Sequence, residues 1–343
     1  MAGINRQLRL KRNIKQGEEI SLDLFDVVES EIPEPAEGQF VVKTAALGFS
    51  PAQRAYLMGA ESRFHEPIAI GEVMRGRGVG EVIASRHPDF KVGEVVACST
   101  GWQEYSLQSG DTSGLLVKTL QKVNNPQQPL HLHLGILGSS AFSAYFGFLK
   151  IGQPKAGETV VISSAAGGVG SIVAQIAKIK GCRVVGIAGG VEKCLWLKEF
   201  VGCDAVIDYK ADSLDEKFKE YCPNGIDIYF DNVGGDTLDY ALKNLALKGR
   251  VVVCGMISTE YHEPPLPGPR YYYNLIYKRA RMEGFFVWDY HEEFPAAEQE
   301  LIEWYQSGQL KSTEVVFNGL LSAPEALQSM FAGSACGIRV VDL

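Results

Sequence analysis

The stretch from Thr159 to Lys180 reads TVVISSAAGGVGSIVAQIAKIK, and its character changes twice along its length. It begins with a β-branched run, Thr159 to Ser163, of the kind that forms a strand buried on both faces of a sheet. Small residues and glycines follow, and from Val169 onward apolar residues recur at helical spacing. The stretch therefore predicts a strand, a tight turn and a helix in that order.

The spacing within the turn is that of a dinucleotide-binding loop. Ala165, Gly167 and Gly170 follow the Gly-x-Gly-x-x-Gly pattern, with alanine in the first position. Because Gly167 has no Cβ, the backbone can approach a pyrophosphate, and Gly170 lets the helix lie close to the strand. The N–H groups that begin the helix would then face the phosphates at the positive end of the helix dipole. Since this spacing alone is a weak signal, an ordinary strand-to-helix turn is the alternative.

The next predicted strand, Arg183 to Ile187, indicates which dinucleotide would bind. NAD-binding chains usually carry Asp or Glu about 20 residues beyond the glycine turn, where the carboxylate bonds the ribose 2′-OH. This chain has Gly189 and Gly190 there, with Lys193 close behind them. A missing carboxylate and a nearby cation favour a 2′-phosphate, so the sequence predicts NADP(H) as the cofactor. Lys193 could alternatively be a solvated lysine in the first turn of a helix.

Length, composition and charge limit the other classes of protein. The chain has 343 residues, of which 46% are hydrophobic, so it can bury two cores and two domains are expected. Its formal net charge is −8 and it lacks a long basic run, which argues against nucleic acid as the main partner. No apolar stretch reaches the length of a membrane span, and the polar N-terminal segment lacks the core of a signal peptide, so no membrane association is expected.

The seven cysteines are scattered along the chain, and no two of them form a Cys-x-x-Cys pair. This pattern is typical of reduced thiols in the cytosol, so a cytoplasmic protein is expected. The same lack of paired cysteines argues against structural zinc. His131 and His133 lack further ligands at metal spacing and are interpreted as structural residues, so no metal site is predicted.

The chain divides by pattern into two regions. Residues 1–130 consist mostly of short strand-like runs between glycines and prolines, which predicts a compact barrel-like domain. Residues from about 310 onward are expected to return to this domain as further strands. Between residues 131 and 309 strands alternate with helices, which predicts an α/β domain with a doubly wound parallel sheet. Its expected strands are 159–163, 183–187, 205–207, 226–231, 250–254 and 283–287, and its expected helices include 140–149, 192–201, 213–221, 235–247 and 271–279.

Ligands of doubly wound sheets bind beside the carboxyl ends of the strands. Two strand ends, residues 231–235 (DNVGG) and 254–258 (CGMIS), are therefore expected at the binding site. Cys254 would lie beside the cofactor, where we expect a small packing residue rather than a nucleophile.

Several segments that span nearly the whole chain resemble one protein family. They are residues 71–76 (GEVMRG), 101–105 (GWQEY), 181–193 (GCRVVGIAGGVEK), 231–235 (DNVGG) and 279–284 (RARMEG). Together with the glycine turn they resemble the zinc-free branch of the medium-chain dehydrogenase/reductases, which holds prostaglandin, curcumin and plant double-bond reductases. Residues 69–72 read AIGE where zinc-dependent alcohol dehydrogenases carry Gly-His-Glu, which argues against zinc-dependent alcohol oxidation.

The resemblance implies a GroES-like β-barrel domain for the substrate, formed by residues 1–130 and completed by 310–343. It further implies a Rossmann NADP(H)-binding domain at 131–309, and a homodimer. The implied reaction is NADPH-dependent reduction of the C=C bond of a small hydrophobic or aromatic α,β-unsaturated carbonyl compound, with hydride to the β-carbon and a proton to the α-carbon. Two alternatives stay open, namely a zinc-free NADPH quinone reductase and an NADPH-binding protein with little turnover.

Carried over by position, the resemblance assigns contacts to each part of the cofactor. The pyrophosphate would rest on the glycine turn, and the 2′-phosphate would lie beyond the strand at 183–187. The nicotinamide would lie beside residues 254–258 and 285–287. Asn232 would reach a ribose hydroxyl, although Tyr209 and Asn232 could instead form ordinary loop hydrogen bonds. The implied contacts are Ala166, Gly167, Gly168, Val169, Gly190, Lys193, Tyr209, Asn232, Cys254, Gly255, Met256, Ile257, Ser258, Phe285, Phe286 and Val287.

The implied substrate pocket departs from the family pattern. Where relatives carry a tyrosine in an Ile-Ser-x-Tyr stretch, this chain has Glu260, and Tyr261 is displaced by one position. Phe64 replaces a second tyrosine, and Ala335 replaces a cofactor-facing asparagine. A neutral phenol suits hydrogen bonding to the developing enolate oxygen, because its pKa of about 10 keeps it protonated at neutral pH. Tyr261 is therefore the first catalytic candidate and Tyr56 the reserve.

Overall fold

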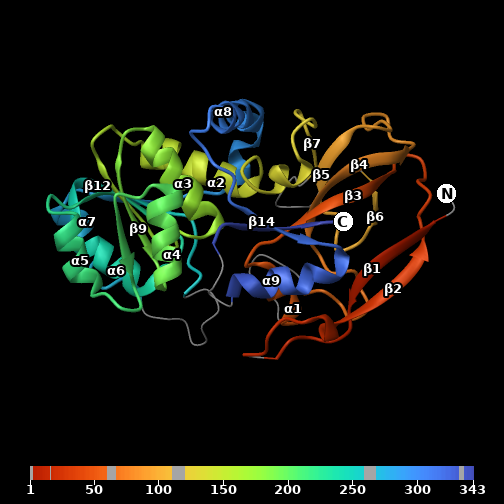
Figure 1. The fold of residues 1–343 in the computed structure, drawn as a ribbon, viewed down its shortest axis with the longest axis horizontal. Coiled ribbons are helices and arrows are strands. Elements are labelled where there is room, and N and C mark those ends of the chain that lie inside the picture. Colours follow the sequence, from red (N-terminus) through yellow and green to blue (C-terminus); the bar gives the residue numbers. More distant parts are fainter. Residues whose placement is uncertain (1–2, 16, 60–66, 110–119, 259–267, 332–335) are drawn as a thin grey trace. The chain divides into compact units, whose positions relative to one another are not determined.

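The computed structural model describes residues 3–15, 17–59, 67–109, 120–258, 268–331 and 336–343 (Figure 1). The chain divides into two compact units. The first unit comprises Met1–Gly138 and Glu314–Leu343, and the second comprises Ser139–Thr313. Among the described residues, no helix is both long and apolar enough to cross a membrane. Four residues singled out above, Phe64, Glu260, Tyr261 and Ala335, lie outside the described residues.

The first unit is built around a largely antiparallel seven-stranded sheet. Its strand order is β14-β15-β3-β4-β5-β7, and β6 pairs with β3 beside this path. β15, from the C-terminal segment, runs antiparallel to β3, while β1 and β2 form a separate antiparallel pair. The elements are β1 (Ile4–Leu10), η1 (Leu22–Leu24), β2 (Phe25–Glu31), β3 (Phe40–Gly48), α1 (Gln53–Leu57), β4 (Arg77–Ser85), β5 (Val95–Cys98), β6 (Tyr105–Gln108), β7 (Gln121–Lys122), η2 (Leu130–Leu134), β14 (Glu314–Asn318), η6 (Leu320–Ser322), α9 (Ala323–Phe331) and β15 (Ile338–Asp342).

The second unit is a six-stranded, fully parallel sheet with helices on both faces (Figure 1). Its strand order is β10-β9-β8-β11-β12-β13, so the order reverses between β8 and β11. This is the Rossmann arrangement, and the predicted fold class is confirmed. The elements are α2 (Ser139–Phe146), η3 (Gly147–Gly152), β8 (Thr159–Ile162), α3 (Gly168–Ile179), β9 (Arg183–Ala188), α4 (Val191–Trp196), η4 (Leu197–Val201), β10 (Ala205–Asp208), α5 (Leu214–Tyr221), β11 (Ile226–Asp231), α6 (Gly235–Lys243), β12 (Leu245–Val253), α7 (Asn274–Tyr277), β13 (Arg281–Gly284), η5 (Val287–Glu293) and α8 (Phe294–Gln306).

The central strands of this sheet are apolar because helices cover both of their faces. On one face, Phe218 of α5 and Leu242 of α6 pack with Tyr229 of β11 in a buried cluster. α3 contacts α2, β8 and β9, and Ile172 and Ile176 on it are fully buried. A helix that is buried on most of its surface needs an apolar sequence, which explains the composition of the stretch after the glycine turn.

Several predicted elements differ from the structure in their bounds. The helix expected at 235–247 ends at Lys243, because Leu245 instead begins β12 and is fully buried in the core. Short apolar runs fit a helix face or a buried strand equally well, so periodicity could not separate the two. The helix expected at 271–279 is only the four-residue α7, and the strand expected at 283–287 is β13, which ends at Gly284. β1, β2, α8 and α9 were not predicted from the sequence.

Arg250 of β12 ties the turn before β8 to the sheet. Its guanidinium donates two hydrogen bonds to the Glu158 carboxylate, at 2.6 and 2.8 Å, and further bonds to the carbonyls of Gly152 and Gln153. The side chains of the ion pair are only 13% and 17% exposed. Burial alone would raise the pKa of Glu158, but the hydrogen bonds from Arg250 and from the Lys155 N–H outweigh it and hold that pKa below its usual value.

We expect Arg250→Met to destabilise the second unit, because it leaves the Glu158 carboxylate and two carbonyls without these donors. Breaking a buried ion pair costs about 3 kcal/mol, which corresponds to a fall in Tm of roughly 6–12 °C for a unit of this size. Thermal unfolding followed by circular dichroism measures the change. Lys217→Met, which breaks the more exposed pair with Glu220, is the control and should change Tm little.

The effect of Arg250→Met should depend on pH. Because the folded-state pKa of Glu158 lies below its unfolded value of about 4.3, the ion pair stabilises the fold above that pH. This contribution is lost as the pH falls through the folded-state pKa and the carboxylate is protonated. The difference in Tm between wild type and variant should therefore be largest near neutral pH and shrink below about pH 4. An equal difference across this range would contradict the assigned role of Glu158.

Candidate cofactor-binding site

The glycine turn connects β8 to α3 at the carboxyl edge of the parallel sheet. α3 begins at Gly168, so the predicted strand, turn and helix are all present. Ser164 has a φ of 49°, and its carbonyl accepts the Gly167 N–H at 2.9 Å, which closes the turn. The first N–H groups of a helix have no carbonyl one turn earlier within the helix. At Gly168 and Val169 the backbone is therefore arranged as it is in anion-binding helix starts, whereas the contacts at Ala166 and Gly167 stay predictions.

The two glycines that flank the start of α3 are required for different reasons. A Cβ on Gly170 would lie 2.3 Å from the Ser164 carbonyl oxygen and 2.8 Å from the Ala165 Cα, so a side chain there would push α3 away from β8. A Cβ on Gly167 would lie 3.1 and 3.2 Å from two oxygens of Ser164, a crowding that small shifts can relieve. Packing thus demands glycine at position 170, whereas packing leaves room at position 167, where the predicted reason for glycine is the approach of a pyrophosphate. The turn fits the dinucleotide that the sequence predicts.

Beneath the turn, Ser163 joins β8 to β11. Its hydroxyl donates to a carboxylate oxygen of Asp231 at 3.0 Å and accepts the Asn232 N–H at 2.8 Å. The same Asp231 oxygen accepts the N–H groups of Val233 and Gly234. Burial raises the pKa of Asp231, although these hydrogen bonds favour its ionised form. The loop after β11 is thereby fixed to the end of β8.

The amide group of Asn232 is held at one end. Its Nδ2 donates to the Ser163 carbonyl oxygen at 2.8 Å. Within the part of the chain that the structure describes, its Oδ1 accepts no hydrogen bond. Since an amide oxygen is an acceptor, it can receive a hydrogen bond from a ribose hydroxyl without disturbing the bond to Ser163.

The loop after β12, residues 254–258, packs along the loop after β11. Its first two residues donate backbone hydrogen bonds to the last carbonyl of β11, and the Ser258 hydroxyl donates to the Val233 carbonyl at 2.6 Å. The side chains of Met256 and Ile257 in the middle of the loop are exposed. The two strand ends singled out in the sequence are therefore brought together, with apolar side chains beside them.

The other residues predicted to lie near the nicotinamide are Cys254 and residues 285–287, and their surroundings differ from one another. Burial raises the pKa of the Cys254 thiol to about 12, so it stays protonated at neutral pH, as a packing residue would. Phe285 packs against η3, since a Cβ on Gly147 would lie 2.5 Å from its ring. Phe286 is 47% exposed, and Val287 begins η5. The ring of Phe285 is thus occupied by a contact inside the second unit, and its place beside the nicotinamide stays a prediction.

The end of β9 carries the predicted 2′-phosphate contacts. Gly190 has a φ of 97°, which suits glycine, and its N–H donates to Asp208 Oδ1 at 2.9 Å. Lys193 lies in the first turn of α4, and Tyr209 follows β10, which pairs with β9. The structure thus brings these residues to one corner of the sheet edge. The position of Asp208 was not predicted, because only the pairing of β9 with β10 reveals it.

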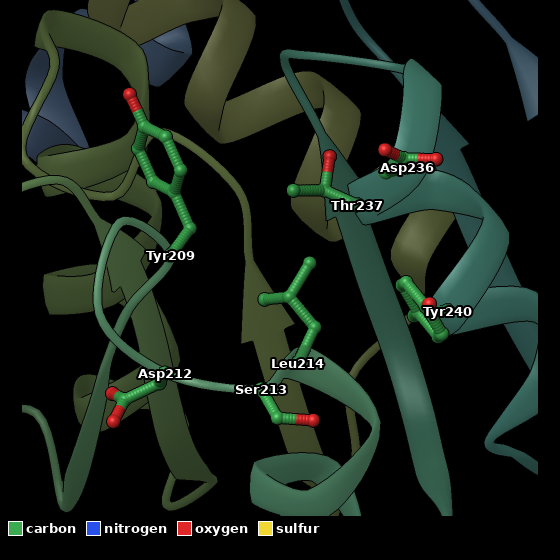
Figure 2. Close-up of a pocket in the computed structure, with 7 residues that line it drawn as sticks. All are labelled: Tyr209, Asp212, Ser213, Leu214, Asp236, Thr237 and Tyr240. Atoms are coloured by element: carbon green, nitrogen blue, oxygen red, sulfur yellow. The ribbon is translucent and has the colours of Figure 1, made fainter.

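A cavity of about 320 Å³ opens beside Tyr209 (Figure 2). Figure 2 shows Thr237, from the start of α6, across the hollow from Tyr209, and the side chain of Leu214, from the start of α5, between them. The Thr237 hydroxyl donates to the Gly234 carbonyl at 2.7 Å, so its methyl group is the part left for packing. A lining of phenol rings, an aliphatic chain and a few polar groups suits a flat heteroaromatic ligand. The remaining lining residues are Asp212, Ser213, Asp236 and Tyr240.

Tyr56, the reserve catalytic candidate, belongs to α1 of the first unit. Its ring is partly buried against a core cluster and lies 5.9 Å from the Arg75 guanidinium. Burial raises the pKa of the Tyr56 phenol more than the charge of Arg75 lowers it. The phenol is therefore a neutral hydrogen-bond donor at neutral pH. Tyr261, the first candidate, lies outside the described residues.

No cluster of three or more His, Cys, Asp or Glu residues within the described ranges could hold a metal ion. His133 is buried, and its Nε2 lies 3.1 Å from the Asn125 carbonyl oxygen. His131 lies 3.4 Å from the Asp342 carboxylate. Both histidines thus have protein partners, as structural residues do.

Comparisons with known proteins match both units. Two family profiles match parts of the chain, "N-terminal domain of oxidoreductase" at residues 6–116 and "Zinc-binding dehydrogenase" at residues 168–303. NADPH-dependent curcumin reductase of Escherichia coli (strain K12) is 38% identical and aligns with 92% of this chain and 91% of its own. The 2-alkenal reductase (NADP(+)-dependent) of Nicotiana tabacum is 39% identical, over 98% and 97%. Prostaglandin reductase 1 of Bos taurus is 36% identical, over 92% and 93%.

Solved structures agree with these relatives. CurA from Vibrio vulnificus superposes with a TM-score of 0.86 at 38% identity, and the match covers 98% of both chains. CurA in complex with NADPH, from the same organism, gives 0.85 at 36% identity and the same coverage. The fold and the glycine turn thus define a dinucleotide-binding oxidoreductase of the medium-chain type. The chain belongs to the zinc-free branch of the medium-chain dehydrogenase/reductase family, as its motifs predicted.

The two glycines should respond differently to alanine. We expect Gly167→Ala to leave Tm within a few degrees, because its Cβ meets only Ser164 at contacts that small shifts relieve. It should weaken NADPH binding about tenfold, because its methyl group would stand where the pyrophosphate is predicted to approach. Gly170→Ala should instead lower Tm strongly, because its Cβ meets backbone atoms that cannot move independently. Thermal unfolding and fluorescence titration with NADPH measure the two effects. If Gly167→Ala bound NADPH with wild-type affinity, the glycine turn would not be part of the cofactor site.

Proposed function

We propose that this protein is an NADPH-dependent reductase of the C=C bond of α,β-unsaturated carbonyl compounds. The observation that carries the proposal is the corner at the end of β9, where Gly190 and Lys193 follow the strand, Tyr209 follows the neighbouring β10, and β9 ends without the carboxylate of an NAD site. Relatives named for NADPH-dependent curcumin reduction and NADP(+)-dependent alkenal reduction, at 38% and 39% identity, support the same cofactor and reaction. The proposed substrate is a small hydrophobic or aromatic enone or enal.

In this proposal the second unit binds NADP(H) along the carboxyl edge of its sheet. The N–H groups at the start of α3 hold the pyrophosphate. Asn232 Oδ1 accepts a hydrogen bond from a ribose hydroxyl. The adenine ring enters the cavity beside Tyr209, and residues 254–258 border the nicotinamide. Bound NADPH supplies the hydride that the β-carbon of the substrate accepts.

The chain's own chemical task is to hold the substrate carbonyl and to stabilise the charge that develops on its oxygen. We assign the substrate to the first unit, which carries Tyr56. A neutral phenol can donate to the enolate oxygen, and burial keeps Tyr56 in that form. Tyr261 is the other candidate for this donor. A proton on the α-carbon then completes the reduction and leaves a saturated carbonyl compound.

Turnover with a panel of acceptors tests the proposed reaction. We expect NADPH, and NADH much less, to be oxidised with α,β-unsaturated ketones and aldehydes, but not with their saturated counterparts. Absorbance at the nicotinamide band follows the rate, and mass spectrometry should show product gaining two hydrogens with its carbonyl intact. Oxidation with quinones alone would make the protein a quinone reductase. Tight NADPH binding without oxidation of any acceptor would make it a binding protein.

We also propose that the protein forms a homodimer through β13. β13 is an edge strand of the parallel sheet, and all four of its residues are exposed. The segment before it adds Ile276 and Tyr277, which are 75% and 72% exposed. An uncovered edge strand offers unpaired N–H and C=O groups to another strand, and exposed apolar side chains beside it favour association.

The charges of β13 favour a second copy of the chain as its partner. Arg281 and Glu283 lie on one face of the strand, 3.5 Å apart. In antiparallel pairing of two copies centred on Met282, each Arg281 would stand opposite Glu283 of the partner subunit. The pattern is therefore self-complementary in one register.

Charge exchange tests this register. We expect Arg281→Glu to weaken the dimer about tenfold in Kd, because like charges then stand opposite one another. Arg281→Glu combined with Glu283→Arg should restore the dimer, since the exchanged pair is again complementary. Analytical ultracentrifugation measures both, and Lys219→Glu, on α5, is a charge-matched control. A monomeric wild type, or a double variant no better than the single one, would contradict pairing through β13.

We place the protein in the cytoplasm. All seven cysteines, each of them among the described residues, are free thiols. Burial raises the pKa of Cys98 and of Cys203 to about 12, so these thiols stay protonated. Unpaired thiols in this number are typical of a reducing compartment.

A further inference from the structure

The end of β9 is shaped by two side chains from the neighbouring strand. β9 pairs with β10 in parallel up to Ala188 and Asp208, so Gly189 lies beside the residues that follow β10. A Cβ on Gly189 would lie 2.7 and 2.9 Å from two ring atoms of Tyr209 and 3.0 Å from Cε of Lys210. Both side chains therefore lie across the bare backbone of Gly189, in the space into which a side chain would project.

The ammonium of Lys210 is the next atom beyond Cε, so it lies at this corner. In the part of the chain that the structure describes, no carboxylate pairs with it. The Lys210 N–H donates to Asp208 Oδ1 at 3.1 Å, and the same oxygen accepts the Gly190 N–H at 2.9 Å. This shared acceptor fixes the start of the Lys210 side chain relative to Gly190.

The charge needed at the corner exceeds what one lysine supplies. A phosphate monoester carries about −1.5 to −2 at neutral pH. The carboxylate of Asp208, which accepts the Gly190 N–H, places a negative charge near this corner. Lys193 contributes one positive charge from the first turn of α4. A second cation at the corner would offset the negative charge that remains and would strengthen phosphate binding.

We propose that Lys210 is this second cation and binds the 2′-phosphate of NADP(H), and that Gly189 lacks a side chain so that Tyr209 and Lys210 can lie across it. This inference rests on the proposed cofactor and extends it. The preference for the phosphorylated dinucleotide is then set by residues after β10 as well as by those after β9. A carboxylate at position 189, as in an NAD site, would displace both side chains.

Binding of two cofactor fragments to the whole protein tests the inference without turnover. Calorimetric titration compares 2′,5′-ADP with 5′-ADP, which differ only in the 2′-phosphate. We expect Lys210→Met to weaken the binding of 2′,5′-ADP about tenfold and the binding of 5′-ADP less than about twofold. Lys210→Arg should keep the wild-type preference for 2′,5′-ADP. Lys155→Met is the matched control, because this exposed lysine precedes β8 at the opposite edge of the sheet. It should bind both fragments as wild type does.

A second variant tests the role of the bare backbone. We expect Gly189→Ala to reduce the preference for 2′,5′-ADP by displacing Tyr209 and Lys210. Adding Lys210→Met to it should then cost little more, because both changes remove the same contact.

The outcomes separate this inference from the proposed function. A wild type that prefers 2′,5′-ADP, with Lys210→Met unchanged or weakened equally for both fragments, would overturn the role of Lys210 and leave NADP(H) as the cofactor. Fully additive losses in the double variant would overturn the role of Gly189. A wild type without preference would overturn the proposed cofactor, and the inference with it.

Discussion

The close approach of Gly170 to the Ser164 carbonyl is the constraint on which the second unit depends. Only 2.3 Å separates that oxygen from the place of a Cβ, so only a bare backbone lets the start of α3 reach the end of β8. This approach lets α3 pack within the core. It also places the unbonded N–H groups of the first helical turn at the strand ends, where anions bind. Gly170 thus sets the packing of α3 and, through it, the position of the helix start on which the proposed cofactor site is built.

The buried carboxylate of Asp231 joins the end of β8 to the loop after β11. These strands are neighbours at the point where the strand order reverses, which is where ligands of such sheets bind. Asp231 accepts hydrogen bonds from the Ser163 hydroxyl and from the N–H groups of Val233 and Gly234, so one side chain joins both loops. These donors replace the water that burial removes. Asp231 therefore acts as a positioning residue for Asn232.

The sequence was most informative where local spacing determines structure. The glycine turn was predicted because the need for bare backbone at position 170 follows from a strand and a helix joined by so short a loop. The surroundings of Gly189 could not be predicted, because Tyr209 and Lys210 reach it only through the pairing of β9 with β10. Phe285 shows the same limit, since its contact with Gly147 joins segments far apart in the chain.

Selection of a phosphorylated dinucleotide requires more than the loss of one carboxylate. Removing it from the end of β9 ends the repulsion of a 2′-phosphate but supplies no attraction. The chain does carry an acid at this corner, Asp208, at the end of β10 rather than β9. There its Oδ1 accepts the N–H groups of Gly190 and Lys210 instead of a ribose hydroxyl. An acid that would favour NAD at the end of β9 thus stands at the end of β10 instead. There Asp208 holds the backbone of Lys210, the lysine proposed to favour NADP(H).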